Sequence, residues 1–500
     1  MKFVIVENPR PLTIEHYNDV ANAPLSASLN SGYALAVARR AGWDTAYLDL
    51  SADVKDAASR AARILAEGGD LILFHWVYSW GHEESIRNVM ELLRRECTAP
   101  LGAFGLFPTL SRQSLLHYAP ELDFILAGEF EGTLVDLLHG FRVKSSVAAL
   151  PGIVLRDEPF VPRPLISDIA RIPVPDDVGA NCGYSSLNIA ASRGCYGECS
   201  FCFIHRFYGC SRRRVRPVAS LELELGARLA RRTIDSLYFI DPSFIGQGVK
   251  ERERVVAISN MVRGLGLPFG FETRVDSINS GLLATLAKNG ADSVFLGIES
   301  GCESVLQRIG KRVTRQQVIR AVRAVQGSGI QLTIGFIMFE PDSTLAEVEG
   351  NYAFLEELRL LTDHDLTANL LYHNQIVLNG STAWERFERE GRLLIAPHLP
   401  FEARYRFRDE RVGTVCSAMG RLSAEYFKRM DDRRRACADR LAAGCSAQNL
   451  GTPDNFNSED VNLLLKEAFR AYCSAAETPH PHGSGRLEER YILQLQDIVK

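Results

Sequence analysis

The sequence predicts an α/β protein made of two regions of alternating strands and helices and a helical C-terminal region. Residues 1–140 alternate short apolar strands with helical stretches, and residues 186–375 repeat this order six times. Such alternation is typical of parallel sheets covered by helices. We therefore expect a doubly wound sheet over 1–140, a linker over 141–185, a partial (β/α)6 barrel over 186–375 and helices over 376–500.

The N-terminal region shows the pattern most clearly. Its strands are expected at 3–6, 45–50, 71–74, 100–104 and 124–127, and its helices at 31–41, 54–67 and 83–95. Gly42 follows the first helix, as a C-terminal capping residue does. Ligands of doubly wound sheets bind at the carboxyl ends of the strands. The segments after Val6, Phe74, Phe104 and Ala127 are therefore the ones in which a site is expected.

The linker and the barrel follow. The runs D-E-P-F-V-P-R-P and R-I-P-V-P-D-D hold five prolines, which predicts an extended linker. The barrel strands are expected at 187–191, 236–240, 269–275, 293–298, 331–337 and 365–371, and the helices at 221–232, 252–264, 280–289, 315–327 and 345–358. Barrel chemistry occurs at the carboxyl ends of the strands. Residues 376–500 are expected to be predominantly helical and to form a cap.

Composition excludes several classes of protein. With 500 residues, 46% of them hydrophobic and 24% charged, the chain suits a soluble protein of two to four domains. The net charge of −4 gives no field for nucleic acid or an anionic membrane. No run of about 18 apolar residues is present, and the apolar start ends at Glu7 and Pro9, so neither a transmembrane helix nor a signal peptide is expected. Eleven unevenly placed cysteines do not indicate a disulfide framework, which favours the cytoplasm.

Three cysteines lie in the run R-G-C-Y-G-E-C-S-F-C-F, namely Cys195, Cys199 and Cys202. Their C-x3-C-x2-C spacing lets three thiolates hold one inorganic cluster and leaves a fourth coordination position open. An iron–sulfur cubane normally takes four cysteines, so a three-cysteine set indicates a catalytic centre with an open position. A zinc site that uses His205 or Cys210 as its fourth ligand is the alternative that the spacing leaves open.

The flanking residues favour iron–sulfur. Gly194 precedes the first cysteine, Phe201 precedes the third, and the apolar run 187–191 leads in like a buried strand. On Phe201 and the three cysteines the chain resembles the radical S-adenosylmethionine (SAM) superfamily. The resemblance implies a 4Fe-4S cluster whose open iron chelates SAM, and one-electron cleavage of SAM to a 5'-deoxyadenosyl radical. It also implies a barrel of six strand–helix units.

The resemblance places SAM at the strand ends of the barrel, with Phe201 beside it. Asp241 begins D-P-S-F after the second strand, where the cobalamin-dependent branch often has D-x-x-F. Arg274 ends the third strand, and its planar guanidinium suits the SAM carboxylate. Gly297 permits close backbone approach, and Glu299 could accept hydrogen bonds from the SAM ribose or ammonium group. An ordinary charge pair across the barrel is the alternative for each charged residue.

Two basic groups are expected to support structure. Arg308 and Lys311 lie in V-L-Q-R-I-G-K, a turn that recurs in the same family, and are expected to be structural or solvated. Arg212–Arg214 and Arg216 follow the cysteines and are expected to anchor that loop, although they could hold an anionic substrate.

The N-terminal loops extend the resemblance to cobalamin-dependent radical SAM enzymes, whose first domain is a Rossmann-like cobalamin-binding domain. Two turns carry it: G-L-F-P-T, matching G-x-x-P-[TS], and G-E-F-E-G-T, matching G-E-x-E-x-T. Glycines and prolines that merely punctuate α/β loops are the alternative. The residues expected to bind cobalamin are His75, Trp76, Tyr78, Gly105, Pro108, Thr109, Gly128, Glu129, Glu131 and Thr133.

One departure concerns cobalt. No D-x-H-x-x-G string is present, so the resemblance implies cobalamin with its base displaced and no ligating histidine. His75, Trp76 and Tyr78 are the nearest candidates for the lower face, and a core or surface role is the alternative for His75. The segment L-N-G-S-T-A resembles a family stretch that closes the barrel, with Asn379 where proline is usual.

The implied activity is methyl transfer to an unactivated carbon of a small molecule, such as an antibiotic precursor. A flavodoxin- or ferredoxin-like electron donor is expected, and no nucleic acid or membrane partner. A radical cyclase or rearrangement enzyme, or a non-catalytic cobalamin-binding protein, would share many of these motifs. A methylthiotransferase is disfavoured because residues 1–181 hold only Cys97. The loops at 75–80, 105–109 and 128–133 should face Cys195–Cys202.

Overall fold

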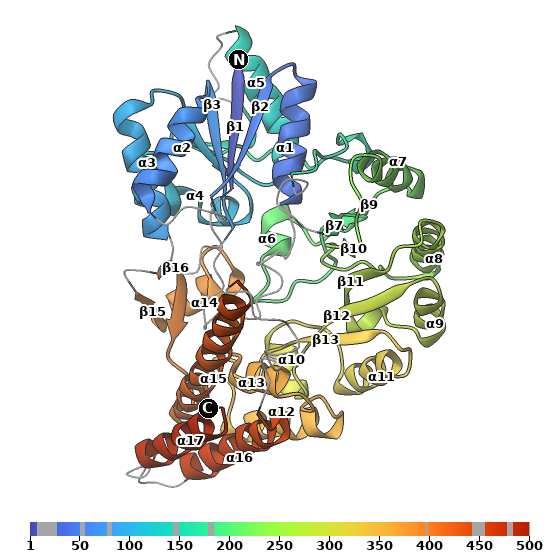
Figure 1. The fold of residues 1–500 in the computed structure, drawn as a ribbon, viewed down its shortest axis with the longest axis vertical. Coiled ribbons are helices and arrows are strands. Elements are labelled where there is room, and N and C mark those ends of the chain that lie inside the picture. Colours follow the sequence, from blue (N-terminus) through green and yellow to red (C-terminus); the bar gives the residue numbers. More distant parts are fainter. Residues whose placement is uncertain are drawn as a thin grey trace.

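The computed structural model describes residues 1–7, 28–50, 56–77, 83–143, 150–178, 185–396, 399–442, 456–477 and 484–499. An N-terminal sheet domain, a partial barrel and a set of C-terminal helices follow one another along the long axis of the molecule (Figure 1). Helix α6 (Ile204–Tyr208) lies between the first two parts. No helix among the described residues is long and apolar enough to cross a membrane.

A six-stranded sheet forms the N-terminal domain. Its order is β2-β1-β3-β4-β5-β6, and all pairings are parallel except that of β5 with β6. The strands are β1 (Lys2–Glu7), β2 (Asp44–Asp49), β3 (Leu71–His75), β4 (Leu101–Phe104), β5 (Phe124–Leu126) and β6 (Ile153–Val154). The helices are α1 (Leu29–Arg40), α2 (Ala57–Glu67), α3 (Glu83–Glu96), α4 (Leu106–Tyr118) and α5 (Phe130–Val143). The five predicted strands and three predicted helices are present.

Both faces of this sheet are buried. In β1, Phe3 and Ile5 join one hydrophobic core, whereas Val4 and Val6 join a second core. Successive side chains of a strand point to opposite faces, so each core lies under its own layer of helices. The sheet is therefore doubly wound, and its order reverses between β1 and β3. Ligands of such sheets bind at this switch point, outside the carboxyl ends of the strands.

Two segments that the sequence suggested as turns are the starts of helices. Gly105 has a φ of 113° and caps α4, and Gly128, with a φ of 71°, precedes α5. Part of the expected extended linker also joins the sheet, because Ile153 and Val154 add β6 to its edge. Both side chains are buried there. A two-residue strand is too short to show a period in the sequence. The 3₁₀ helix Ile169–Arg171 follows.

Five parallel strands form the barrel, in the order β13-β12-β11-β10-β7. They are β7 (Ser186–Ile189), β10 (Ser236–Phe239), β11 (Phe269–Arg274), β12 (Ala291–Glu299) and β13 (Gln331–Phe336). The helices are α7 (Val218–Leu229), α8 (Val249–Gly264), α9 (Ser280–Lys288), α10 (Glu303–Arg308), α11 (Arg315–Gln326) and α12 (Leu345–Glu357), with a 3₁₀ turn at Val275–Ser277.

The predicted sixth barrel strand is wrong. Its segment forms α13 (His364–Tyr372), whose N-terminus is capped by Asp363, which accepts a hydrogen bond from the Leu366 N–H at 3.0 Å. Among the described residues, the sixth position holds one parallel bridge between Phe339 and Asn374. The reason for the error is that a short apolar run does not distinguish a buried helix from a buried strand.

The C-terminal region is mainly helical, but it also contains an antiparallel sheet that the sequence did not predict. Its helices are α14 (Thr382–Arg389), α15 (Glu410–Ala442), α16 (Ser458–Glu477) and α17 (Ser484–Ile498). The sheet has the order β14-β16-β15, formed by Val377–Leu378, Leu399–Tyr405 and Leu393–Ala396. Tyr352 of α12 stacks on Phe469 of α16 with 4.9 Å between ring centroids. The helical cap therefore shares the hydrophobic core of the barrel.

Candidate functional site

The three cysteines lie on a loop with a short antiparallel stem. The stem strands are β8 (Ser192–Arg193) and β9 (Arg214–Val215), and Arg193 is paired directly with Arg214. Gly194 leaves the stem with a φ of 82°, and a Cβ there would lie 2.3 Å from the Arg212 carbonyl oxygen. Glycine is therefore required immediately before Cys195.

The loop is held from two sides. The Ser200 N–H donates to the Ile309 carbonyl at 2.9 Å, and the Ala383 N–H donates to the Ser200 carbonyl at 3.0 Å. Ala383 belongs to the segment that the sequence suggested as closing the barrel. Cys195 and Cys199 are buried, and Cys202 is half-buried. Burial, followed by the nearby Cys199, raises the pKa of Cys202 to about 12.

Cationic groups surround these sulfurs. Arg274 Nη1 lies 3.6 Å from Cys199 Sγ, and its Nη2 donates to the Lys311 carbonyl at 2.9 Å. The Arg274 guanidinium also lies over the Tyr196 ring, 5.0 Å from its centroid. Three thiols with a guanidinium and an ammonium nearby suit an anionic iron–sulfur cluster. Arg274, predicted to bind SAM, is thus placed against the cysteines themselves.

The structure does not favour the zinc alternative. In the described ranges, no three His, Cys, Asp or Glu side chains are grouped closely enough to hold a single metal ion. His205 instead lies 3.3 Å from the Thr382 hydroxyl, through its Nε2.

Glu299 and Gly297 form one unit with Lys311 at the end of β12. Glu299 Oε1 accepts from Lys311 Nζ at 2.7 Å, and both side chains are buried. Glu299 has a φ of 64°, at a place where the pairing of β12 with β13 shifts register. A Cβ on Gly297 would lie 2.8 Å from Glu299 Oε1 and 3.0 Å from Lys311 Nζ. Gly297 therefore leaves the room that the ion pair occupies.

The remaining residues predicted to bind SAM are placed differently. Asp241 is fully buried, accepts from the Ala191 N–H at 2.9 Å and is hydrogen-bonded to the Ser192 hydroxyl. Burial raises the pKa of Asp241. It therefore joins the end of β7 to the stem of the cysteine loop. Phe201 is half-buried between Cys199 and Cys202.

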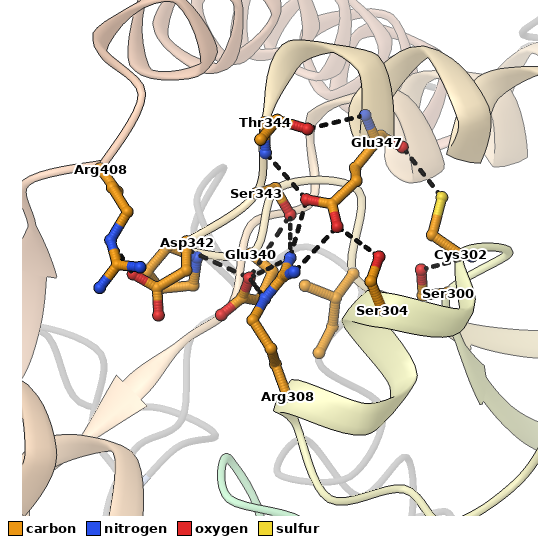
Figure 2. Close-up of polar contacts among 12 residues, drawn as sticks. Ser300, Cys302, Ser304, Arg308, Glu340, Asp342, Ser343, Thr344, Glu347 and Arg408 are labelled. Carbon is orange, nitrogen blue, oxygen red and sulfur yellow. Dashed lines mark hydrogen bonds and ion pairs between the residues drawn. The ribbon is translucent and has the colours of Figure 1, made fainter.

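A polar network follows β13 (Figure 2), and of its members the sequence analysis singled out Arg308 but not the acidic residues. Arg308 contacts Glu340 at 3.0 Å and donates to Glu347 at 2.8 and 2.9 Å. Burial raises the pKa of Glu347, but the hydrogen bonds from Arg308, Ser304 and Thr344 and the charge of Arg308 together hold that pKa at about 2. Asp342 is paired with Arg392 at 2.6 Å. The available signal was the run E-P-D-S-T at a barrel strand end.

The predicted cobalamin residues meet at the carboxyl edge of the N-terminal sheet. His75 Nδ1 lies 2.8 Å from Glu7 Oε1 and 3.1 Å from the Ser28 hydroxyl, and the His75 ring is almost fully buried. Trp76 is fully buried against Phe107. Tyr78 lies outside the described residues. His75 is thus held by hydrogen bonds at the switch point between β1 and β3.

Thr109 connects the two predicted turns. Its hydroxyl donates to the Gly105 carbonyl at 2.7 Å and accepts from the Gly128 N–H at 2.9 Å. Pro108 is buried beside it in α4. A Cβ on Gly105 would lie 2.9 Å from both His75 Cδ2 and the Trp76 carbonyl oxygen. The starts of α4 and α5 and the end of β3 are therefore packed against one another.

The second turn faces the cysteine loop. Glu129 and Glu131 form ion pairs with Arg193 and Arg214 of the loop stem, and the Thr133 hydroxyl donates to the Pro151 carbonyl at 3.1 Å. Hydrogen bonds from Arg214 and the charge of Arg193 outweigh burial and lower the pKa of Glu129. The predicted approach of segment 128–133 to the cysteine loop is therefore present.

This edge also suits a ligand rich in amide groups. Glu131 Oε2 and the Ser111 hydroxyl are buried and make no hydrogen bond with any described residue. An unpaired buried acceptor is costly, so each is available to a donor on a bound molecule. The amide side chains of a corrin ring are donors of this kind.

Comparison with known proteins identifies the central domain. Residues 189–355 match the family model of the radical SAM superfamily. The chain therefore contains a radical SAM domain. An uncharacterised methyltransferase from Pyrococcus horikoshii is 29% identical over 271 residues, which are 50% of this chain and 56% of that protein. The 4'-phospho-dehydrooxetanocin synthase of Priestia megaterium is 28% identical over 304 residues, 54% of this chain and 40% of the synthase. The alignments cover about half of each of these relatives.

A solved structure extends the likeness of this radical SAM protein beyond the barrel. The cobalamin-dependent SAM radical enzyme OxsB, with aqua-cobalamin bound, matches with a TM-score of 0.78 at 18% identity. The match covers 100% of this chain and 80% of that chain. The N-terminal sheet, the barrel and the C-terminal helices therefore share the overall fold of a cobalamin-dependent radical SAM enzyme.

Proposed function

We propose that this radical SAM protein is a cobalamin-dependent methyltransferase that moves a methyl group from SAM, by way of cobalamin, to an unactivated carbon of a small molecule. The position of the cysteine loop carries the proposal. Its stem contacts the start of α5, at the carboxyl edge of the N-terminal sheet. A cluster on the loop would therefore face a cofactor bound at that edge.

The cysteine loop and the end of β12 would hold the first pair of cofactors. Cys195, Cys199 and Cys202 would bind a 4Fe-4S cluster with one iron open to SAM. Lys311 lies near these cysteines and is paired with Glu299, which lies beside Gly297. The SAM ribose or ammonium group could bind near Gly297 and Glu299. Burial of Cys195 and Cys199 would keep water from the cluster.

The N-terminal edge would hold cobalamin. Gly105, Thr109, Gly128 and Glu131 lie at this edge, and the unpaired Glu131 oxygen would accept a hydrogen bond from a corrin amide. Together, the bound cofactors supply reductive cleavage of SAM, hydrogen-atom abstraction and methyl transfer. The chain's part is to hold the two sites in a fixed geometry.

The proposed substrate is a small molecule of natural-product type, such as an antibiotic precursor, and the proposed electron donor is flavodoxin- or ferredoxin-like. The name of the Pyrococcus relative supports methyl transfer. A second candidate is a cobalamin-dependent radical ring closure or rearrangement, since the Priestia relative is named a synthase and not a methyltransferase. A mass gain of one methylene in the product would separate methylation from a reaction that leaves the carbon count unchanged.

The experiment that tests the class uses protein expressed without oxygen in the presence of cobalamin and then reconstituted with iron and sulfide. We expect about four irons for a 4Fe-4S cluster and one cobalamin per chain. Addition of SAM and a low-potential reductant should yield 5'-deoxyadenosine. Zinc in place of iron, or iron without cleavage of SAM, would refute the proposal.

A further inference from the structure

Four charged residues join the stem of the cysteine loop to the N-terminal domain. Arg214 donates to both oxygens of Glu129, at 2.7 Å each. Arg193 donates to Glu129 at 3.2 Å and to Glu131 at 2.5 Å. We call these four residues the stem clamp.

The stem clamp is buried and closely fitted. The exposed fractions of its four side chains lie between 3% and 11%. The guanidinium of Arg193 lies 5.2 Å from the centre of the Tyr33 ring, and that of Arg214 lies 5.3 Å from the centre of the Tyr208 ring. Two arginines balance two glutamates, so the clamp carries no net charge. Breaking a buried pair leaves an uncompensated charge, which is far costlier than losing a surface pair.

The stem clamp connects the cysteine loop to the edge of the N-terminal sheet. Arg193 stands two residues before Cys195, and Arg214 occupies the same rung of the stem, so both ends of the cysteine loop are fixed. Across the interface, Glu131 lies in the first turn of α5, on the edge where cobalamin would bind. One Glu131 oxygen binds Arg193, and the other is buried without a partner among the described residues.

We propose that the stem clamp couples the two cofactor sites, so that the cluster on the cysteine loop and cobalamin on the N-terminal edge strengthen each other's binding. This inference rests on the proposed function. A donor from cobalamin on the free Glu131 oxygen fixes that carboxylate, and the carboxylate fixes Arg193 and the start of the cysteine loop. Coupling between two binding sites is reciprocal, so an ordered cluster loop must raise the affinity for cobalamin by the same factor.

The test compares the affinity for hydroxocobalamin with and without the cluster. Absorbance titration of the cluster-free and the reconstituted full chain gives two dissociation constants, whose ratio measures the coupling. We expect the cluster to tighten binding about fivefold or more in the wild type. Arg193→Lys should bring the ratio close to one, because an ammonium cannot bridge two carboxylates as a guanidinium fork does.

Two further variants complete the design. Arg216→Lys is the matched control, because Arg216 is equally buried but is paired with Glu224 of α7, inside the barrel. It should keep the wild-type ratio. Glu131→Gln changes no residue of the loop stem and should bring the ratio of the two dissociation constants close to one. This variant tests the coupling if Arg193→Lys does not fold.

The outcomes separate the coupling from the proposed function. A wild-type ratio of one, or an unchanged ratio in both Arg193→Lys and Glu131→Gln, overturns the coupling while cobalamin binding stands. A wild-type chain that binds no hydroxocobalamin in either form overturns the proposed function and the coupling with it.

Discussion

The buried pair between Lys311 and Glu299 gives the sharpest test of how the barrel mouth is built. Lys311→Met removes the ammonium and keeps most of the length of the side chain. At 2.7 Å and an effective dielectric constant of about 20, the attraction in the pair is about 6 kcal/mol, and desolvation offsets part of it. Breaking one partner of a buried pair typically costs about 3–5 kcal/mol. We expect the free energy of local unfolding to fall by about 3 kcal/mol.

Hydrogen exchange of β12 and β13 in the cofactor-free protein measures this loss, because exchange of core strands reports local and global opening even when several domains unfold separately. The double variant Glu299→Gln/Lys311→Met should recover about half of the loss or more, since neither charge is then left alone. Gly297→Ala should also weaken this ion pair, because the added Cβ would lie 2.8 Å from Glu299 Oε1 and 3.0 Å from Lys311 Nζ.

The neighbouring pair of Arg312 with Glu198 is the matched control. The two side chains are also 2.7 Å apart, but both are well exposed. Arg312→Met should leave exchange in β12 and β13 unchanged, because solvent screens surface pairs. Equal effects of Lys311→Met and Arg312→Met, or a Lys311→Met effect that Glu299→Gln does not modify, would refute the reasoning.

Three further predictions address the site and its pH dependence. Cys199→Ser should abolish the visible absorbance of the reconstituted cluster and reduce bound iron to near zero, and full iron content in this variant would contradict the assignment. Because the His75 ring is almost fully buried and its Nε2 lies 3.5 Å from Asn30 Nδ2, the electron paramagnetic resonance spectrum of the cob(II)alamin-bound protein should lack nitrogen splitting from an axial histidine, and should be identical in His75→Ala. Burial raises the pKa of Glu272 to about 7, so folding stability should fall as pH rises from about 4.5 to 7, where the unfolded chain loses this proton first. Glu272→Gln should flatten that part of the melting temperature profile, and an unchanged slope would count against the shift.

Local sequence signals predicted much of the fold. The strands of both parallel sheets are apolar runs between glycine, proline and polar segments, and such runs carry their own period. The cysteine spacing identified the loop, and Gly128 identified the turn whose Glu129 and Glu131 contact its stem. The sixth barrel strand and β6 could not be predicted, since one is a helix with a strand-like apolar run and the other is two residues long.

The assignments of single residues depended on tertiary contacts. Arg274 was expected to face SAM, but the Cys199 sulfur and the Lys311 carbonyl hold its guanidinium. Asp241 joins the end of β7 to the loop stem. The sequence alone does not predict these contacts, because Arg274 and Cys199 are 75 positions apart.

By itself, the sequence predicted the fold class of the two domains, the group of three cysteines and the edge of each sheet at which a site is expected. These follow from hydrophobic period, glycine conformation and ligand spacing, which act over a few residues. Only the tertiary structure decided that Glu129 and Glu131 bind Arg193 and Arg214. Charged side chains take the partners that burial brings near them, and burial is fixed by packing between segments far apart in the chain.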